Sequence, residues 1–361
     1  MIIDGAQTAA GRPAGELLLL GFAILRSMFR YPIRLPRLRL SDAVLMALEI
    51  IARQTYFRFP ALVERFSAPR SRPAGPPQQA TLGELRDVLD RLGVRPGALA
   101  MVHTSVRGAS LVDDKAGGRN LISPAGVAAG LLSLLLDLVG DTGTLVMPTH
   151  PAYQDGRRHL SGGEESDSLV RYDPLKTPCH VGLTNELFRR LPGAQRSMHP
   201  LQSVSARGPQ ASELLQNNLN DSRPLPHGVD SAYYRICQKR GLVVSIGVPL
   251  LEYFTLIHTA EDVRDSEWPI RDFFRERRFR VRSGPDEAEW VVRERRPLFA
   301  RSYCEGQLHR DFLREGILHE GKAGSLRVDF ARANEVFEYL MWRNKGNTYP
   351  YFLANLAKWG G

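Results

Sequence analysis

Cysteines are few in this sequence, and long apolar runs are missing. Three cysteines are spread over 361 residues and none forms a Cys-x-x-Cys pair. This pattern favours free thiols in a reducing compartment over a disulfide framework. No stretch reaches about 18 uninterrupted apolar residues, so no membrane-spanning helix is predicted. Residues 1–16 carry an early acidic residue and no convincing cleavage site, and we therefore expect a cytoplasmic protein without a secretory signal.

The motifs of several common enzyme classes are also missing. The chain has no Walker A loop, no His-Glu-x-x-His, no Gly-x-Ser-x-Gly, and no Gly-x-Gly-x-x-Gly after a predicted strand. Hydride transfer, P-loop phosphoryl transfer and serine-hydrolase chemistry therefore lose their usual sequence support. We also expect no metal ion.

Positive charge is concentrated at the N-terminal end. The net charge is +9, and residues 1–75 contain 11 Arg and no Lys against five acidic residues, a net +6. A nucleic-acid partner for the whole chain is therefore not predicted. Apolar stretches at 15–29 and 42–57 each predict a helix with an apolar face. Such an extension is typical of peripheral contact with an anionic membrane, or of packing on the main domain or in a homodimer interface.

Residues 76–361 have the pattern of an α/β protein. A Pro-rich stretch at 67–80 predicts a linker between this domain and the extension of residues 1–75. We expect a three-layer α/β/α domain with a mixed sheet, preceded by a helical N-terminal extension. Further helices are predicted at 185–191, 231–240, 255–263 and 333–343, strands at 202–208 and 241–248, and a β-hairpin over 277–282 and 289–295.

A strand–helix–strand unit begins this domain. Thr81 and Glu84 form a capping box for a first helix, followed by a buried strand at 98–105. Ser123-Pro124 opens a second helix, and a strand follows at 144–149. A right-handed crossover would make these strands parallel, with a ligand crevice at the carboxyl end of the first strand.

Three polar residues end that first strand: His103, Thr104 and Ser105. Together with the nearby start of the Ser123 helix they could bind the pyrophosphate of a cofactor. The alternative is a buried strand that ends in hydrogen-bonded polar residues.

A second polar group lies in the loop before the strand at 202–208. It contains Arg196, Ser197 and His199. A loop histidine can accept a proton near neutral pH, and the other two side chains suit a phosphate or a pantetheine amide. The alternative role for this histidine is to cap a turn.

A third group lies on the helix predicted at 255–263. His258 and Glu261 are three residues apart and share one face with Thr255, so the carboxylate could orient the imidazole. The alternatives are a polar surface face, or a metal site that lacks an obvious third ligand. Cys179 and Cys304 have no activating context for a nucleophilic thiol.

These groups occur in an order that resembles the aminoglycoside 3-N-acetyltransferase family, also called the antibiotic N-acetyltransferase family. The resemblance covers about three-quarters of the chain and not residues 1–75. The matching segments are 92–106, 139–151, 172–200, 204–211, 227–236, 241–249, 255–262 and 314–330. It implies direct transfer of an acetyl group from acetyl-CoA to an amine.

The resemblance also implies roles for individual residues. The family's Arg-Ser-x-His-Pro motif falls on residues 196–200, and from it we expect His199 to be the general base. The family's Thr, His and Glu motif falls on Thr255, His258 and Glu261, where Glu261 would orient the base. Catalytic residues are thus expected at His199, Glu261 and His258, cofactor contacts at His103, Thr104, Ser105, Arg196, Ser197 and Ser203, and substrate contacts at Thr255 and Asp230.

Two departures from the family pattern lie where acceptor specificity would be set. Ala232 replaces a proline, and the segment at 217–228 is longer than expected. From these departures and from the extra N-terminal segment of residues 1–75, we expect an acetyl-CoA-dependent N-acetyltransferase that modifies an amino sugar of a polysaccharide or secondary-metabolite pathway. The alternatives are an aminoglycoside 3-N-acetyltransferase that confers antibiotic resistance, an enzyme with a longer acyl-CoA or carrier-protein donor, and an inactive sugar-binding scaffold at the membrane.

Overall fold

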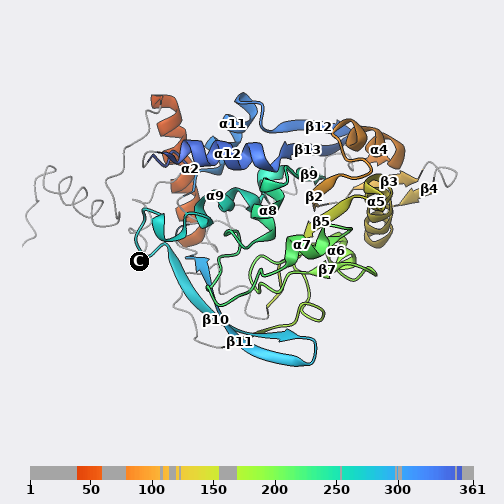
Figure 1. Ribbon diagram of the computed structural model, residues 1–361. Coiled ribbons are helices and arrows are strands. Elements are labelled where there is room, and N and C mark those ends of the chain that lie inside the picture. The colour runs from red at the N-terminus through yellow and green to blue at the C-terminus, as the bar shows by residue number, and fades with distance from the viewer. Residues whose placement is uncertain are drawn as a thin grey trace, which may run out of the picture.

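A seven-stranded mixed sheet forms the centre of the molecule (Figure 1). The computed structural model describes residues 39–58, 79–105, 109–113, 119–121, 123–153, 169–252, 254–296, 299, 303–345 and 348–351. The sheet strands are β2 (Leu99–Thr104), β5 (Thr144–Pro148), β7 (Gln195–Arg196), β8 (Val204–Arg207), β9 (Leu242–Ile246), β12 (His319–Ala323) and β13 (Leu326–Arg332). Their spatial order is β12-β13-β9-β2-β5-β8-β7.

The three central strands of this sheet are parallel. β2 pairs in parallel with both β5 and β9, whereas the outer strands pair antiparallel. The predicted parallel pair of β2 and β5 is therefore confirmed, and α5 (Pro124–Val139) connects them. Because the carboxyl ends of parallel strands meet at one edge, the residues that follow β2, β5 and β9 converge there.

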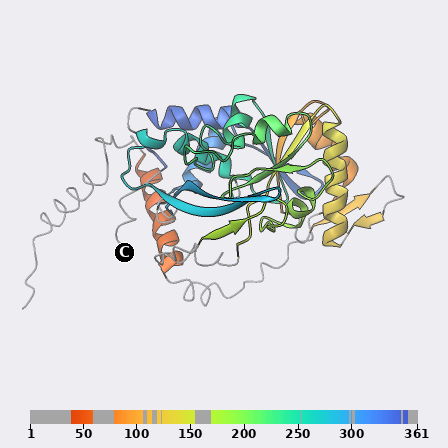
Figure 2. The same ribbon diagram turned by 60° about the horizontal axis from the view of Figure 1, so that its bottom comes forward.

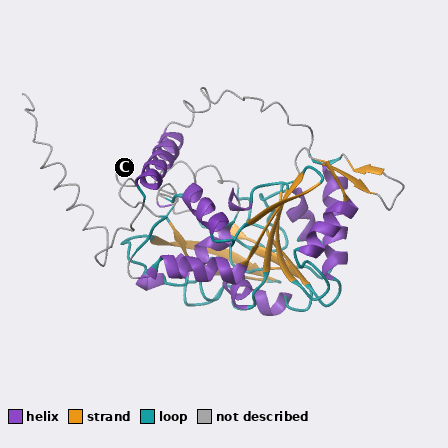
Figure 3. Ribbon diagram, turned by 90° about the horizontal axis from the view of Figure 1, so that it is seen from above, coloured by secondary structure: helices purple, strands orange, loops and turns teal. Residues whose placement is uncertain are grey.

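Helices cover both faces of the sheet (Figure 3). In β2, Leu99 and Met101 face one core while Ala100 and Val102 face the other, as the period of a strand requires. One core includes α4 (Leu82–Arg91), α5 and α6 (Leu183–Phe188), and the other includes α7 (Ala211–Leu215), α8 (Ala232–Gln238), α9 (Thr259–Asp262), α11 (Glu305–Arg314) and α12 (Ala333–Arg343). The predicted three-layer α/β/α architecture is confirmed.

Local sequence signals explain where the first helices begin. Thr81 Oγ1 accepts a hydrogen bond from the Glu84 amide at 2.9 Å, and Glu84 accepts one from the Thr81 amide at 2.8 Å, which completes the capping box. The Ser123 hydroxyl caps α5 by accepting from the Gly126 amide at 3.1 Å.

Two three-stranded sheets lie beside the central one. β10 (Phe274–Ser283) and β11 (Asp286–Arg295) form the predicted hairpin, longer than expected, and β6 (Val170–Tyr172) pairs with β10. The hairpin extends along one side of the molecule (Figure 2). The other sheet contains β1 (Gln79–Thr81), β3 (Ser110–Asp113) and β4 (Arg119–Leu121). The helix predicted at 255–263 is a 3₁₀ turn, η2 (Thr255–His258), that continues into α9.

The second apolar stretch of the N-terminal extension forms α2 (Leu40–Arg58), which packs against α11. Met46 and Ile50 are buried with Cys304, and the Gly306 amide donates to the carboxylate of Glu49 at 3.0 Å. The opposite face of α2 is exposed. The stretch at 15–29 and most of the predicted linker lie outside the described residues, and the division at residue 75 stays a prediction. No helix within the described ranges is long and apolar enough to cross a membrane.

Candidate active site

Histidines converge at the edge of the sheet where the parallel strands end. His103 ends β2, His150 follows β5, and His258 follows β9 through the turn η1 (Leu250–Glu252). The ring of His180 lies 5.9 Å from that of His150, and the ring of His227 lies 5.7 Å from that of His258. Tyr233 joins the two pairs, because its hydroxyl is 3.1 Å from His150 Nε2 and its ring is 4.5 Å from that of His227.

The predicted pair of His258 and Glu261 lies in this cluster. Nδ1 of His258 is 3.3 Å from Glu261 Oε2. Arg295, the last residue of β11, places Nη1 at 2.5 Å from the same oxygen and at 2.6 Å from Nδ1. All these contacts are on the Nδ1 side of the ring, and Nε2 makes no hydrogen bond to any described residue. A guanidinium has only N–H donors, so Nδ1 either accepts from Arg295, which places the ring proton on Nε2, or donates its proton to Glu261, which leaves the Nε2 lone pair free for a ligand.

Charge and burial set the protonation of this pair. Burial lowers the pKa of His258, Arg295 lowers it further, and Glu261 opposes both. For Glu261, burial would raise the pKa, but Arg295 and His258 hold it below its ordinary value. The pair is therefore a neutral imidazole beside an ionised carboxylate, the state that a general base requires.

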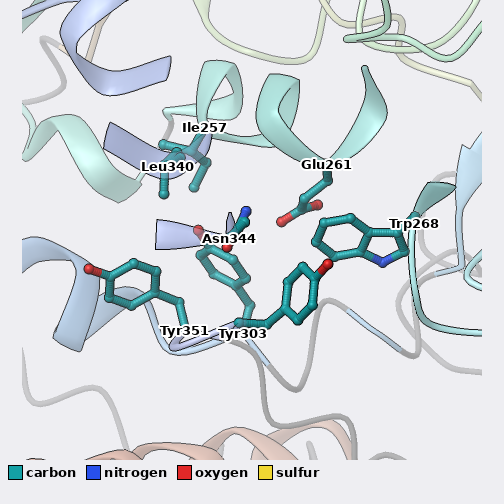
Figure 4. Close-up of a pocket in the computed structure, with 8 residues that line it drawn as sticks. Ile257, Glu261, Trp268, Tyr303, Leu340, Asn344 and Tyr351 are labelled. Atoms are coloured by element: carbon teal, nitrogen blue, oxygen red, sulfur yellow. The ribbon is translucent and has the colours of Figure 1, made fainter. Parts of the chain in front are cut away.

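Glu261 is screened from bulk water on its other side. Its carboxylate points toward a small cavity between the rings of Trp268 and Tyr303 (Figure 4). The volume of about 10 Å³ offers room for at most about one water molecule. Such an enclosed site strengthens the interaction of the carboxylate with its two partners.

A second histidine–carboxylate pair, which the sequence analysis missed, adjoins the first. His227 Nδ1 lies 3.2 Å from Asp262 Oδ2, and the His227 amide donates to the same oxygen at 3.1 Å. Its buried Nε2 has no hydrogen-bond partner among the described residues. His227 and Asp262 are 35 residues apart, so the sequence does not show that they form a pair. Its one signal is that Asp262 directly follows Glu261.

His199, the predicted general base, is tied into its own loop. Its Nδ1 accepts from the Leu201 amide at 3.1 Å, and its Nε2 lies 3.1 Å from the carbonyl oxygen of Pro224. Burial lowers the pKa of His199 to about 4. Both ring nitrogens are thus occupied by backbone groups, which matches the turn-capping alternative. The role of His199 as base stays a prediction that this geometry does not favour.

Arg196, Ser197 and Ser203, predicted to contact the cofactor, are also bonded internally. The guanidinium of Arg196 donates to the Ser203 hydroxyl at 3.1 Å and to the carbonyl oxygens of Pro174, Thr177 and Thr149. Ser203 donates to the Thr149 carbonyl at 2.8 Å, and the Ser197 hydroxyl accepts from the Val204 amide at 3.3 Å. These side chains brace the loops around β7 and β8, and their predicted contact with the cofactor gains no support from the geometry.

The three predicted cofactor residues at the end of β2 differ from Arg196, Ser197 and Ser203 in their hydrogen bonding. Both ring nitrogens of buried His103 have no hydrogen-bond partner among the described residues, and burial lowers its pKa to about 4. Thr104 donates to the side-chain oxygen of Asn185 at 3.1 Å, and the Ser105 amide pairs with the Ile246 carbonyl. A neutral, unpaired imidazole therefore remains available to a ligand at this strand end.

The two predicted substrate residues, Thr255 and Asp230, differ in their surroundings. The buried hydroxyl of Thr255 has no hydrogen-bond partner within the described part of the chain. Asp230 lines a cavity of about 310 Å³ together with Asp262 and Asp265. Asp265 pairs with Arg293 at 2.6 Å, and Asp230 accepts from Asn220 at 3.1 Å.

Neither cysteine considered in the sequence analysis has an activated thiol. Burial raises the pKa of Cys179, and Cys304 is buried under α2. Among the described residues, no group of three or more potential ligands is arranged to hold a metal ion.

The family model for aminoglycoside 3-N-acetyltransferase matches residues 101–343, which is more than half of the sequence. The chain belongs to this family. The predictions of the family and of an N-acetyltransferase that uses an acyl-CoA donor are confirmed, and acetyl-CoA as co-substrate follows from the same membership.

Several members of the family are similar to the chain. Aminoglycoside N(3)-acetyltransferase IX from Micromonospora chalcea is 30% identical over 280 residues, covering 72% of this chain and 91% of the relative. Aminoglycoside N(3)-acetyltransferase IV from Salmonella sp. is 31% identical over 49% of this chain and 57% of the relative. The crystal structure of aminoglycoside acetyltransferase AAC(3)-Xa has a TM-score of 0.56 at 24% identity, covering 75% of this chain and 94% of that one, which supports the fold.

Proposed function

We propose that the protein transfers the acetyl group of acetyl-CoA to an amine of an aminoglycoside, with His258 as the general base and Glu261 as its orienting partner. The similar proteins favour this acceptor over the amino sugar of a polysaccharide pathway that the sequence analysis preferred. The relatives are aminoglycoside N(3)-acetyltransferases, and neighbours of similar fold are described as bound to CoASH and to sisomicin. Residues 1–75, on which the other preference partly depended, lie outside the family match.

One observation carries the assignment of the base. Only the Nδ1 side of His258 is engaged, by Glu261 and Arg295, while His199 has both ring nitrogens bonded to the backbone. A general base needs a free lone pair directed at its substrate and a partner that stabilises the imidazolium. His258 meets both conditions in the tautomer that carries its proton on Nδ1 and donates it to Glu261, while Arg295 hydrogen-bonds the carboxylate of Glu261.

The reaction begins with an acceptor amine that is protonated in solution. The amine must lose this proton before its lone pair can attack the thioester carbonyl. As the C–N bond forms, Nε2 of His258 takes a second proton from the attacking nitrogen, and Glu261 stabilises the resulting imidazolium. The tetrahedral oxyanion then collapses, the C–S bond breaks, and the leaving CoA thiolate takes the proton held on Nε2 of His258, which returns the ring to its neutral form. The free hydroxyl of Thr255 is a suitable donor to the oxyanion.

The cavity beside the histidine cluster suits a polycationic acceptor. Three carboxylates from Asp230, Asp262 and Asp265 line it together with Arg293, which pairs with Asp265. Asp230 and Asp262 remain without a cationic partner from an arginine or lysine among the described residues, and Asp262 is in direct contact with His227. An aminoglycoside carries several ammonium groups, whose charge these carboxylates would complement. The donor would lie at the end of β2 beside His103, Thr104 and Ser105, where the imidazole of His103 has no partner among described residues.

The test is turnover of acetyl-CoA with a matched panel of acceptors, measured as thiol release and as acetylated product by mass spectrometry. We expect turnover with aminoglycosides such as sisomicin and little with simple amino sugars such as glucosamine or nucleotide-linked amino sugars. Turnover only with the amino sugars would replace the proposed acceptor. Absence of thiol release with every acceptor and donor would overturn the enzymatic assignment.

A further inference from the structure

Two arginines on one face of β11 hold the segment that carries the catalytic pair. Arg293 and Arg295 are two residues apart, so their side chains point to the same side of the strand. Arg293 forms an ion pair with Asp265, directly after the helix α9. Arg295 reaches Glu261 and His258. The end of the hairpin is thus fastened to the catalytic segment at two points.

The two contacts differ in whether the arginine also reaches the imidazole of His258. Arg293 bonds both carboxylate oxygens of Asp265 and touches no part of the catalytic pair. Nη1 of Arg295, in contrast, lies at about equal distance from Glu261 Oε2 and His258 Nδ1, at 2.5 and 2.6 Å. A fixed positive charge therefore stands in contact with the imidazole, in a buried site where charges interact strongly.

Resting on the function proposed above, we propose that Arg295 is a positioning residue for the general base. Its guanidinium hydrogen-bonds Glu261 and holds it as the carboxylate that accepts the Nδ1 proton. The positive charge of Arg295 opposes a second proton on the ring, so that His258 meets its substrate as a neutral base with a free lone pair on Nε2. Glu261 alone would do the opposite, because a buried carboxylate next to a histidine favours the imidazolium.

The groups that face His258 support this balance. Glu261 comes from α9, Arg295 from β11, His227 from the loop before α8, and the ring of Tyr303 lies 5.9 Å away. After burial, Arg295 is the largest cause of the lowered pKa of His258, and His227 adds a smaller effect in the same direction. Removal of Arg295 leaves the attraction of Glu261 unopposed by a full positive charge, so the pKa of His258 must rise.

The experiment compares Arg295→Gln and Arg295→Lys with Arg293→Gln as the matched control from the same strand face. The pH dependence of kcat/KM is measured with acetyl-CoA and sisomicin. We expect Arg295→Gln to move the acidic limb of the profile upward by about one to three pH units, with activity recovering at alkaline pH. Arg295→Lys keeps the charge and should keep the limb near its wild-type position. Arg293→Gln alters the lining of the acceptor cavity and can change the size of kcat/KM, but it should leave the pH of the limb unmoved.

A second measurement does not depend on turnover. The imidazole of His258 is titrated by NMR in protein labelled at the histidine Cε1, and its signal is identified from a His258→Asn variant. A higher pKa in Arg295→Gln than in the wild type supports the proposal even if sisomicin is not the acceptor. An unchanged pKa, or a loss of activity by the same factor at every pH, would show that Arg295 is only a structural tie and would overturn it.

Discussion

Replacing His258 and His199 in turn gives the sharpest test of the proposed site. In His258→Ala, the amine loses its proton acceptor, and removal of a general base lowers kcat by about 10²- to 10⁴-fold. In His199→Ala, the Pro224 carbonyl and the Leu201 amide lose buried partners. Each unpaired buried group costs about 1–3 kcal/mol, so the fold should lose stability while the chemistry of correctly folded molecules is retained.

The assay for this pair separates stability from turnover. Thermal unfolding and kcat per folded molecule are measured for both alanine variants, and His199→Gln is added because it can retain one backbone contact. We expect a lower melting temperature and a near-normal kcat for the His199 variants. For His258→Ala we expect a near-normal melting temperature and a strongly lowered kcat. If His199→Ala loses 10²-fold in kcat at an unchanged melting temperature while His258→Ala turns over normally, the reasoning is wrong.

Four further predictions follow from the same contacts. Glu261→Gln should lower kcat by about tenfold or more with a small effect on KM, because a neutral amide stabilises the imidazolium less than a carboxylate does. A rise in KM alone would instead mean that Glu261 contacts the substrate amine. The pKa values of His103 and His199 are lowered to about 4 in the folded protein, so the unfolded chain binds more protons between pH 6.5 and 4. The free energy of unfolding should therefore decrease as the pH is lowered through that window, by up to about 3 kcal/mol per histidine, as measured by denaturant titration. EDTA should leave turnover intact, and a loss restored by a divalent cation would disprove this. Deletion of residues 1–58 should lower the melting temperature, because α2 buries Met46 and Ile50 against Cys304. If the deletion instead leaves stability unchanged and abolishes salt-sensitive binding to anionic liposomes, the membrane role is favoured.

The parts of the fold that were predictable are those with local signals. The capping box at Thr81, the Ser123 start of α5 and the hairpin predicted over 277–282 and 289–295 each depend on neighbouring residues, and all three agree with the structure. The edge strand β12 and its neighbour β13 were missed. β12 reads His-Glu-Gly-Lys-Ala and carries almost no apolar pattern, because four of its five residues are exposed. Its place in the sheet follows only from pairing with β13.

The site was predictable at the level of segments and not of individual roles. His199 and His258 each stand in a polar motif beside hydroxyl or charged residues, and nothing in those motifs says which ring keeps a free nitrogen. That difference comes from distant partners: Pro224 for His199, and Arg295 for His258, each more than 20 residues away. The tertiary fold brings a backbone carbonyl to the first ring and a guanidinium to the second. The carbonyl occupies a ring nitrogen of His199. In the proposed mechanism the guanidinium bonds Glu261, its charge keeps the ring of His258 neutral, and Nε2 is left to react. The chemical role of each histidine is therefore decided by what the loop at 224 and the end of the hairpin bring to it, and changes in those two places should alter catalysis without touching either motif.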